Sequence, residues 1–410
     1  MASTPETTST PKDSTSTPPS STFSLHGRAL KFDDLPSIEP YLTQISTHSP
    51  PITTLILGGN TLGVPASIGL ASTLETQKDL QTVDLSDIFT SRLISEIPLA
   101  LKSLCTSLLK VDGLTELNLS DNAFGGRSAE PMLEFISTHP NLRVLKLNNN
   151  GMGPAGGAMI AGALFDNAEN HNKHNRPSTL TTIICGRNRL ENGSSAAFAK
   201  AFAALKSLKE VRMPQNGIRM EGIEAIVEGL RENKALEVLD LQDNTATQRG
   251  SKAIARSLPF WPKLHTLNLS DCLLRPKGAL SIFTTLSTGS NPHLRSLKLQ
   301  SNEMNAVPIL ELARAIESHL GELNDLELNG NLGEEGDECY EKVREALAKW
   351  GNEDGLDELD ELEEEEGEEE EEEDGEEDVE SESGEGEEKK EQEDSLANDL
   401  ANAFAKVHVA

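Results

Sequence analysis

Apolar residues recur along the chain in short groups that alternate with polar positions, and the same group returns at a nearly constant spacing. The most complete copy of this group is residues 142–153, Leu-Arg-Val-Leu-Lys-Leu-Asn-Asn-Asn-Gly-Met-Gly. The apolar positions have the period of a short β-strand with one buried face, and the asparagines that follow predict a turn. The group begins again, at separations of 28, 34, 28, 38, 28, 28, 28, 30 and 29 residues, at Ile52, Leu80, Leu114, Leu142, Leu180, Leu208, Leu236, Leu264, Leu294 and Leu323.

Each of these ten units also contains a helical pattern between its turn and the next strand. Ile223, Ile226, Val227 and Leu230, for example, stand at positions i, i+3, i+4 and i+7. The consensus LxxLxLxxNxLG is that of the leucine-rich repeat. Units of this length, each with a strand, a turn and a helix, predict an α/β solenoid. We expect a right-handed horseshoe with a parallel sheet on the concave face and helices outside.

An asparagine closes most of the turns, and we expect it to be mechanical, because a buried side-chain amide can bond the backbone of its own turn and of its neighbour. Cys272 takes this place in the eighth unit and Ile88 in the second. The asparagines are Asn60, Asn122, Asn150, Asn188, Asn216, Asn244, Asn302 and Asn331.

Composition divides the chain into four parts. Residues 1–22 are rich in Ser, Thr and Pro and are predicted to be disordered. Residues 23–350 form the repeat domain, in which a degenerate first unit beginning near Phe23 caps the stack. Residues 351–394 are predicted to be a disordered acidic tail, and residues 395–410 a short amphipathic segment.

The formal net charge of −32 lies mostly in that tail. Residues 351–394 hold 28 Asp and Glu against 2 Lys, a net −26, which leaves about −6 for residues 1–350. A partner of the tail is therefore expected to be basic, and nothing favours nucleic acid. No apolar run is long enough to span a bilayer, and no signal peptide is recognisable. Four cysteines without a CxxC pair predict reduced core thiols in a cytosolic or nuclear protein.

Two units depart from the common length. The second has 34 residues, and its turn, Leu85-Ser-Asp-Ile-Phe-Thr-Ser-Arg92, lacks the asparagine. The fourth has 38 residues, with a polar insertion around residues 165–179. His171 and His174 in that insertion have the spacing of metal ligands but no third ligand nearby, so a solvated loop is expected. We find no set of nucleophile, base and orienting group, and we predict no enzyme active site and no metal site.

Several non-consensus strings resemble the Ran GTPase-activating proteins in their simple, fungal form. The resemblance covers nearly the whole chain after Phe23, and the string from Ile184 to Ser194 is the most specific part, because no repeat consensus demands it. The strings are Ser86-Asp-Ile-Phe-Thr-Ser-Arg92, Leu119-Ser-Asp-Asn-Ala-Phe-Gly125, Asn149-Asn-Gly-Met-Gly-Pro154, Ile184-Cys-Gly-Arg-Asn-Arg-Leu-Glu-Asn-Gly-Ser194, Leu239-Asp-Leu-Gln-Asp-Asn244 and Asp271-Cys-Leu-Leu274.

The resemblance implies an activator that binds GTP-loaded Ran and accelerates its GTP hydrolysis in support of nucleocytoplasmic transport. The chain is then not itself an enzyme and holds no cofactor, since magnesium and GTP belong to Ran. Many GTPase activators insert an arginine finger; this family is implied to position the GTPase's own glutamine instead. Expected partners are Ran-GTP, together with a Ran-binding protein or transport receptor, but no nucleic acid or membrane. The chain is expected to be a cytoplasmic monomer.

Carried over residue by residue, the resemblance assigns two site residues. Asn149 matches the asparagine that lies next to the GTPase's glutamine, and Arg92 matches an essential arginine that supports the complex without touching phosphate. The repeat pattern places both on the turn edge, on strands about 10 Å apart, within reach of one globular partner. Asp121, Arg187 and Asp243 occupy the same edge and are candidate partner contacts, or ordinary polar turn residues.

Two other functional classes remain open from the sequence alone. Leucine-rich repeats followed by polyglutamate also describe acidic, histone-binding, chaperone-like proteins, although those repeats are shorter and fewer. A ribonuclease-inhibitor-like scaffold shares the period, but such scaffolds are typically richer in cysteine.

Overall fold

The structure, a computed structural model, describes residues 20–363. The predictions for the acidic tail beyond residue 363, for the amphipathic segment at 395–410 and for residues 1–19 lie outside the described residues.

One parallel sheet runs through the described residues. Its eleven strands are hydrogen-bonded in the order in which they occur along the chain. Each has three residues, and the middle residue pairs with the middle residue of its neighbour, as Leu117 does with Leu145. The strands are β1 (Thr22–Ser24), β3 (Thr54–Ile56), β5 (Thr82–Asp84), β6 (Glu116–Asn118), β7 (Val144–Lys146), β8 (Thr182–Ile184), β9 (Glu210–Arg212), β10 (Val238–Asp240), β11 (Thr266–Asn268), β12 (Ser296–Lys298) and β13 (Asp325–Glu327). A separate pair joins β2 (Lys31–Phe32) to β4 (Thr61–Leu62).

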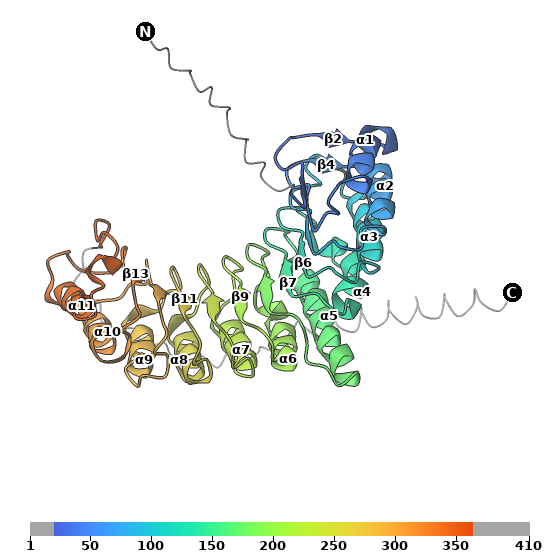
Figure 1. The fold of residues 1–410 in the computed structure, drawn as a ribbon. Helices are drawn as coiled ribbons and strands as arrows, with labels where there is room; N and C mark the ends of the chain where they lie inside the picture. The colour runs from blue at the N-terminus through green and yellow to red at the C-terminus, as the bar shows by residue number, and fades with distance from the viewer. Residues whose placement is uncertain (1–19, 364–410) are drawn as a thin grey trace, which may run out of the picture. The chain divides into compact units, whose positions relative to one another are not determined.

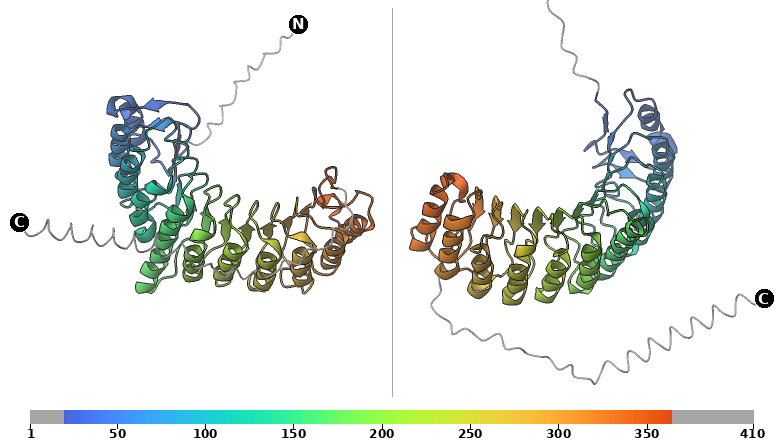
Figure 2. Two further views of the ribbon diagram at one scale, coloured as in Figure 1. Left: turned by 180° about the vertical axis from the view of Figure 1, so that it is seen from behind. Right: turned by 60° about the horizontal axis from the view of Figure 1, so that its bottom comes forward.

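The helices lie outside the sheet, on the convex face of the arc, each packed against the helices of the adjacent units (Figure 1). Figure 2 shows the same layering from two further sides. The leucine-rich repeat fold and its concave sheet are thereby confirmed. The helices among residues 20–363 are α1 (Leu35–Ser46), α2 (Val64–Leu74), α3 (Ile97–Leu108), α4 (Glu130–Thr138), α5 (Gly153–Lys173), α6 (Ser195–Leu205), α7 (Met220–Leu230), α8 (Thr247–Ser257), α9 (Arg275–Leu286), α10 (Ala306–His319) and α11 (Glu338–Ala348).

The apolar positions of the repeat form one continuous core between sheet and helices. As predicted, Ile223, Ile226, Val227 and Leu230 lie on one helix, α7, and all four are fully buried. The four cysteines are free and buried, as expected of core thiols. Burial raises the pKa of Cys105, Cys185 and Cys272 to about 12, so these thiols stay protonated at neutral pH.

The degenerate N-terminal unit, which precedes the unit at Ile52, begins slightly before the predicted position. β1 starts at Thr22, and Phe23 is buried in the core, so the fold includes residues that we assigned to the disordered N-terminus. The predicted strand and helix of this degenerate unit are both present. Its helix α1 begins with a capping box in which Asp34 and Ser37 each bond the other's backbone.

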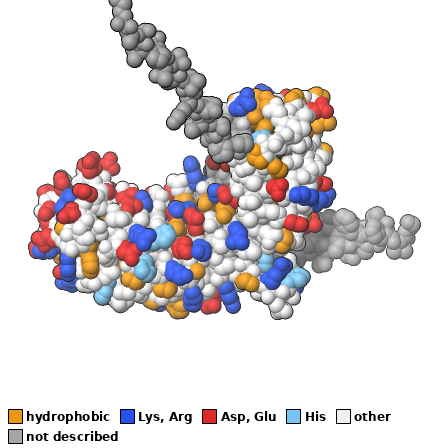
Figure 3. Space-filling model, in the orientation of Figure 1, with side chains coloured by type: hydrophobic (Ala, Val, Ile, Leu, Met, Phe, Trp, Pro, Cys, Tyr) orange, Lys and Arg blue, Asp and Glu red, His pale blue; other side chains and the backbone are white. Residues whose placement is uncertain are grey.

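The predicted domain boundary at residue 350 is wrong, because residues 351–363 continue the fold. Leu356 forms an isolated bridge with Leu326 beside the last strand, and Glu363 pairs with Leu332. The Asp357 carboxylate accepts hydrogen bonds from the backbone nitrogens of Leu328 and Asn329, at 2.9 and 3.1 Å. This segment therefore satisfies edge groups that another repeat would otherwise bond. Acidic side chains gather at this end of the visible face (Figure 3).

The polar insertion of the fourth unit is a helical extension, which corrects the expected loop. α5 has 21 residues and continues to Lys173, past the ends of its neighbours (Figure 1). His171 is buried on it, not solvated, whereas His174 caps it and is exposed. Burial is the main reason why the pKa of His171 lies below its ordinary value. A run of polar residues misled the prediction because Asn167 and His171 pack inward at helical spacing.

Candidate functional site

The turn edge, where each strand passes into the loop before its helix, carries a repeated asparagine ladder. Asn150 is fully buried, and its Nδ2 donates to the carbonyl oxygens of Leu147 and Leu119, both at 3.0 Å. Its Oδ1 accepts from the backbone nitrogen of Asn122 at 2.8 Å. One side chain thus bonds its own turn and the preceding unit, which confirms the mechanical role predicted for these asparagines.

Two of the ten units that begin at Ile52 lack the ladder asparagine. In the eighth unit the Cys272 thiol donates to the Leu241 carbonyl oxygen at 3.3 Å, a contact like that of an amide. In the second unit Ile88 is fully buried and offers no polar side chain. The ladder is therefore interrupted in the turn that follows β5.

The residue immediately before each ladder position has a left-handed backbone. Such conformations favour Gly, Asn and Asp, so Arg187 and Gln215 are unusual occupants. The backbone sets the direction in which these side chains leave the turn, and the preference explains the polar composition of the row. The row comprises Gly59, Asp87, Asp121, Asn149, Arg187, Gln215, Asp243, Asp271, Ser301 and Gly330.

Asn149 lies in the middle of this row, at φ 52°, and is exposed. Its backbone nitrogen donates to the Gly186 carbonyl oxygen at 2.9 Å, which ties the turn to the next unit. Its Nδ2 donates to Oδ1 of Asp121 at 3.0 Å. Asn149 therefore presents a polar side chain to solvent from a backbone that is held firmly in place.

Arg92 is placed differently from the expectation. Its side chain is only 11% exposed, and it forms an ion pair with Asp33 at 2.6 Å. Nε donates to Oγ1 of Thr61 at 2.8 Å, and Nη2 donates to the Thr61 carbonyl oxygen at 3.1 Å. Thr61 and Asp33 belong to preceding units, so the guanidinium points back along the solenoid and not toward Asn149. The structure does not bring the two predicted residues together as equally exposed contacts.

The bonds of Arg92 hold the irregular loop of the second unit. Thr61 also donates through Oγ1 to the Thr90 carbonyl oxygen at 2.8 Å, so this bond and those from Arg92 join the loop to β4. Directly after the arginine, Leu93 and Ile94 are about two-thirds exposed. We did not identify Thr61, Asp33 or this apolar pair from the sequence. The length of the second unit and the absence of a ladder asparagine were the signals available.

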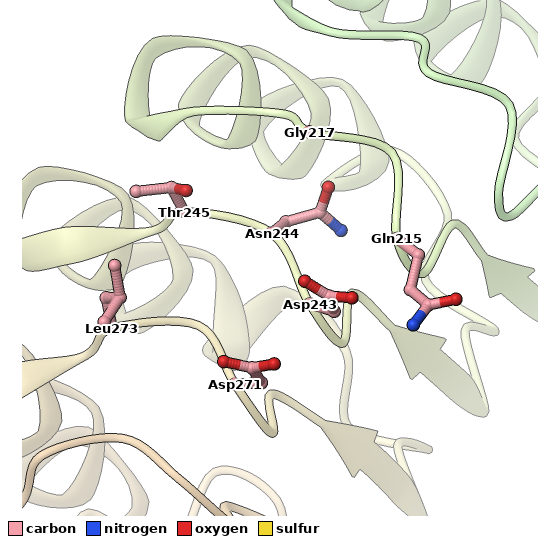
Figure 4. Close-up of a pocket in the computed structure, with 7 residues that line it drawn as sticks. All are labelled: Gln215, Gly217, Asp243, Asn244, Thr245, Asp271 and Leu273. Atoms are coloured by element: carbon pink, nitrogen blue, oxygen red, sulfur yellow. The ribbon is translucent and has the colours of Figure 1, made fainter.

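The remaining candidates lie further along the edge. Arg187 is exposed, and Asp243 is half-buried. Asp243 and Asp271, from successive turns, lie with Gln215 around a cavity of about 300 Å³ whose other walls include Thr245 and Leu273 (Figure 4). This cavity is acidic and polar.

The adjoining concave face is laced with charged pairs. Lys146 pairs with Glu116 at 2.6 Å, and Arg212 pairs with Glu210 at 2.6 Å and with Asp240 at 3.6 Å. Burial raises the pKa of Asp240 above its ordinary value, against the opposing hydrogen bond from Gln242 and the charge of Arg212. No group of three His, Cys, Asp or Glu residues suited to a metal ion occurs between residues 20 and 363.

Sequence similarity identifies both the repeats and the family of this chain. The leucine-rich repeat model matches residues 114–133, 138–161 and 290–307. A Ran GTPase-activating protein 1 of Saccharomyces cerevisiae is 41% identical over 325 residues, which cover 77% of this chain and 79% of the yeast protein. The chain belongs to the Ran GTPase-activating protein family. The Xenopus laevis member is 42% identical over 200 residues, or 48% of this chain and 34% of the frog protein.

A solved internalin from Listeria monocytogenes aligns with 82% of this chain and 86% of its own, at a TM-score of 0.41 and 14% identity. Within the described residues, every helix is too short or too polar to cross a bilayer.

Proposed function

We propose that this protein binds GTP-loaded Ran by the turn edge of its repeats and accelerates hydrolysis of the bound GTP. Membership of the Ran GTPase-activating protein family supports this proposal. The hydrolysis takes place in Ran's active site, so magnesium and GTP belong to Ran and the chain acts as an activator without a cofactor of its own.

The observation that carries the proposal is the exposed amide of Asn149 on a tethered, left-handed turn. Such an amide both donates and accepts hydrogen bonds. Placed beside the catalytic glutamine of Ran, it holds that glutamine in the orientation that aligns the attacking water. Orientation of this kind lowers an activation barrier because the reacting groups no longer have to find their geometry by chance.

Arg92 supports this edge from within and does not act as an arginine finger. A finger must leave its own protein and reach the transferred phosphate. The Arg92 guanidinium instead bonds Thr61 and Asp33, and its side chain is only 11% exposed. It therefore stabilises the loop of the second unit, which carries the exposed Leu93 and Ile94 at its surface.

Further contacts with Ran come from the same edge. Arg187 and Asp243 stand one residue before a ladder asparagine, as Asn149 does, and their opposite charges define the register in which a partner binds. Asp121 belongs to the same row, where its carboxylate bonds Asn149. The activator works as a cytoplasmic monomer that keeps Ran in the GDP form there, so that nuclear and cytoplasmic Ran differ in bound nucleotide and transport gains its direction.

The decisive experiment is single-turnover hydrolysis of Ran-bound GTP with the wild-type chain, Arg92→Ala and Asn149→Ala, beside a control with Ran alone. We expect strong acceleration by the wild type and large losses in both variants. Ser301→Ala, at the same register near the far end of the edge, is the matched control and should retain full activity.

The two losses should differ in kind. Asn149→Ala should lower the rate at saturation, whereas Arg92→Ala should also reduce the thermal stability of the N-terminal units. A folded wild-type sample that leaves the hydrolysis rate of Ran unchanged would overturn the proposal.

A further inference from the structure

Asp121 and Asn149 occupy equivalent places in consecutive units. Their strands β6 and β7 pair in register, Leu117 opposite Leu145, and both residues have left-handed backbones, at φ 62° and 52°. Both side chains are exposed, and they meet across the two turns at 3.0 Å, Nδ2 of Asn149 to Oδ1 of Asp121. A carboxylate thus lies directly beside the amide that the proposed function places next to Ran's glutamine.

This contact fixes which way the Asn149 amide faces. An ionised carboxylate only accepts hydrogen bonds, whereas an amide has a donating nitrogen and an accepting oxygen. With the amide turned over, its Oδ1 would face a carboxylate oxygen, and two acceptors repel each other. The favoured orientation directs Nδ2 to Asp121 and leaves Oδ1 to accept a hydrogen bond from a partner.

Neither residue is free to drift out of this arrangement. The backbone nitrogen of Asp121 donates to the Asn148 carbonyl oxygen at 2.8 Å, and that of Asn149 donates to Gly186 at 2.9 Å. Each turn is therefore bonded to the unit after it. A side chain that is oriented before the partner arrives loses less conformational entropy when the complex forms.

We propose that Asp121 is a positioning residue for activation: it holds the Asn149 amide so that Oδ1 faces Ran and accepts a hydrogen bond from the side-chain amide of Ran's glutamine. This inference rests on the proposed function and refines it. Asp121 then acts through Asn149, whereas a direct partner contact would act on binding.

Steady-state kinetics with Ran-GTP separate the two roles. Asp121→Ala should lower kcat roughly fivefold to tenfold, the value of about one hydrogen bond, and change KM by less than about twofold. Asp121→Asn should recover part of the rate, since its Oδ1 can still accept. Asp271→Asn is the matched control, because Asp271 has the same backbone register but is followed in the next unit by Ser301. A raised KM with unchanged kcat in Asp121→Ala would overturn the positioning role.

A double-mutant cycle tests whether Asp121 acts through Asn149. In the Asn149→Ala background, Asp121→Ala should cause no further loss of kcat, because no amide remains to orient. Losses that multiply in the double variant would show that Asp121 acts independently, and would overturn the inference.

A readout without Ran separates this inference from the proposed function. In the free full-length protein labelled with ¹⁵N-asparagine, the side-chain NH₂ resonances of Asn149 should shift in Asp121→Ala and stay in place in Asp271→Asn. Unchanged resonances beside an active wild type would overturn the inference alone. Shifted resonances beside a wild type that does not accelerate hydrolysis would keep the orientation of Asn149 and overturn its assigned use on Ran.

Discussion

The turn after β7 and the turn after β5 are held in place by different side chains. After β7 the buried Asn150 bonds its own turn and the preceding unit, and the residue before it, Asn149, faces solvent. After β5 the buried position is Ile88, which bonds nothing through its side chain, and Arg92 reaches back to Thr61 and Asp33. A polar residue of a turn can therefore serve the fold in one unit and be exposed to solvent in another.

The hydrogen bonds of a polar side chain on the turn edge show whether it serves the fold or remains exposed. Both Arg92 and Asn149 are polar residues of a loop that follows a strand, although the counterpart of Asn149 in the second unit is Asp87. What separates them is whether the side chain already has its hydrogen bonds. The Arg92 guanidinium is bonded to three residues of preceding units, counting the longer contact to the Phe32 carbonyl oxygen at 3.4 Å. The Asn149 amide instead donates a hydrogen bond to Asp121, and its side chain is exposed to solvent.

The largest loss of stability should follow from a substitution in the regular turn after β7. Asn150→Ala removes two donated hydrogen bonds and one accepted bond in a fully buried place, so the free energy of unfolding should fall by about 3 kcal/mol. Asn149→Gly, one residue earlier, tolerates the left-handed backbone and should change stability by less than about 0.5 kcal/mol. Urea unfolding of both variants measures the contrast. Equal shifts would contradict the division of labour between the two residues.

Changes in the irregular turn after β5 should lower the free energy of unfolding by less, and should affect only the neighbouring units. Arg92→Ala removes the bonds to Thr61 and exposes their partners, so we expect a loss of about 2 kcal/mol. Arg92→Lys should restore the ion pair with Asp33 but not the bonds to Thr61, because an ammonium lacks the fork of a guanidinium. Hydrogen exchange should quicken around residues 61–62 and 89–96 and stay slow in the C-terminal units. Unchanged protection there would show that the loop does not depend on Arg92.

In the turn after β13, a side chain from the C-terminal segment bonds the backbone groups of the turn. Asp357→Ala removes the acceptor of the Leu328 and Asn329 backbone nitrogens and should reduce stability by about 1 to 2 kcal/mol. Asp360, whose contact is the exposed Nδ2 of Asn329 at 2.9 Å, supplies the matched control. Asp360→Ala should change stability by less than about 0.5 kcal/mol. Thermal unfolding of the two variants compares them directly, and the reverse order would rule out a capping role for Asp357.

The smallest effect concerns a charge at the start of a turn. Asp84, the last residue of β5, and Asp240, the last residue of β10, each accept from a backbone nitrogen two residues on, at 2.9 and 3.1 Å. Burial raises the pKa of Asp240, so the folded state protonates this group more readily than the unfolded chain does. Its contribution to stability therefore grows as pH falls through the folded pKa, and that increment is absent in Asp240→Asn.

Unfolding measured at pH 7 and in mild acid checks this sign. Relative to the wild type, Asp240→Asn should be more stable at pH 7 than in acid, by a difference within about 1 kcal/mol. Asn keeps an acceptor for the Gln242 nitrogen, so the comparison isolates the charge. A variant that gains relative stability on acidification would contradict the raised pKa.

The repeat architecture could be predicted from the sequence because its information is local and is repeated ten times. Each unit places the same apolar residues at strand and helix spacing, and no unit can bury them without its neighbours. The ladder asparagines could be predicted for the same reason. The helical end of α5 and the cap formed by residues 351–363 could not, since polar composition there concealed residues that pack inward.

The sequence by itself determined the solenoid, its turn edge and the row of residues from which Asn149 projects, because period and turn chemistry are properties of single units. Only the tertiary structure decided that Arg92 bonds Thr61 and Asp33, and that Asp121 holds the Asn149 amide. The residues of these contacts lie 28 to 59 positions apart in the sequence. Their pairing depends on how the units stack, which no single unit encodes.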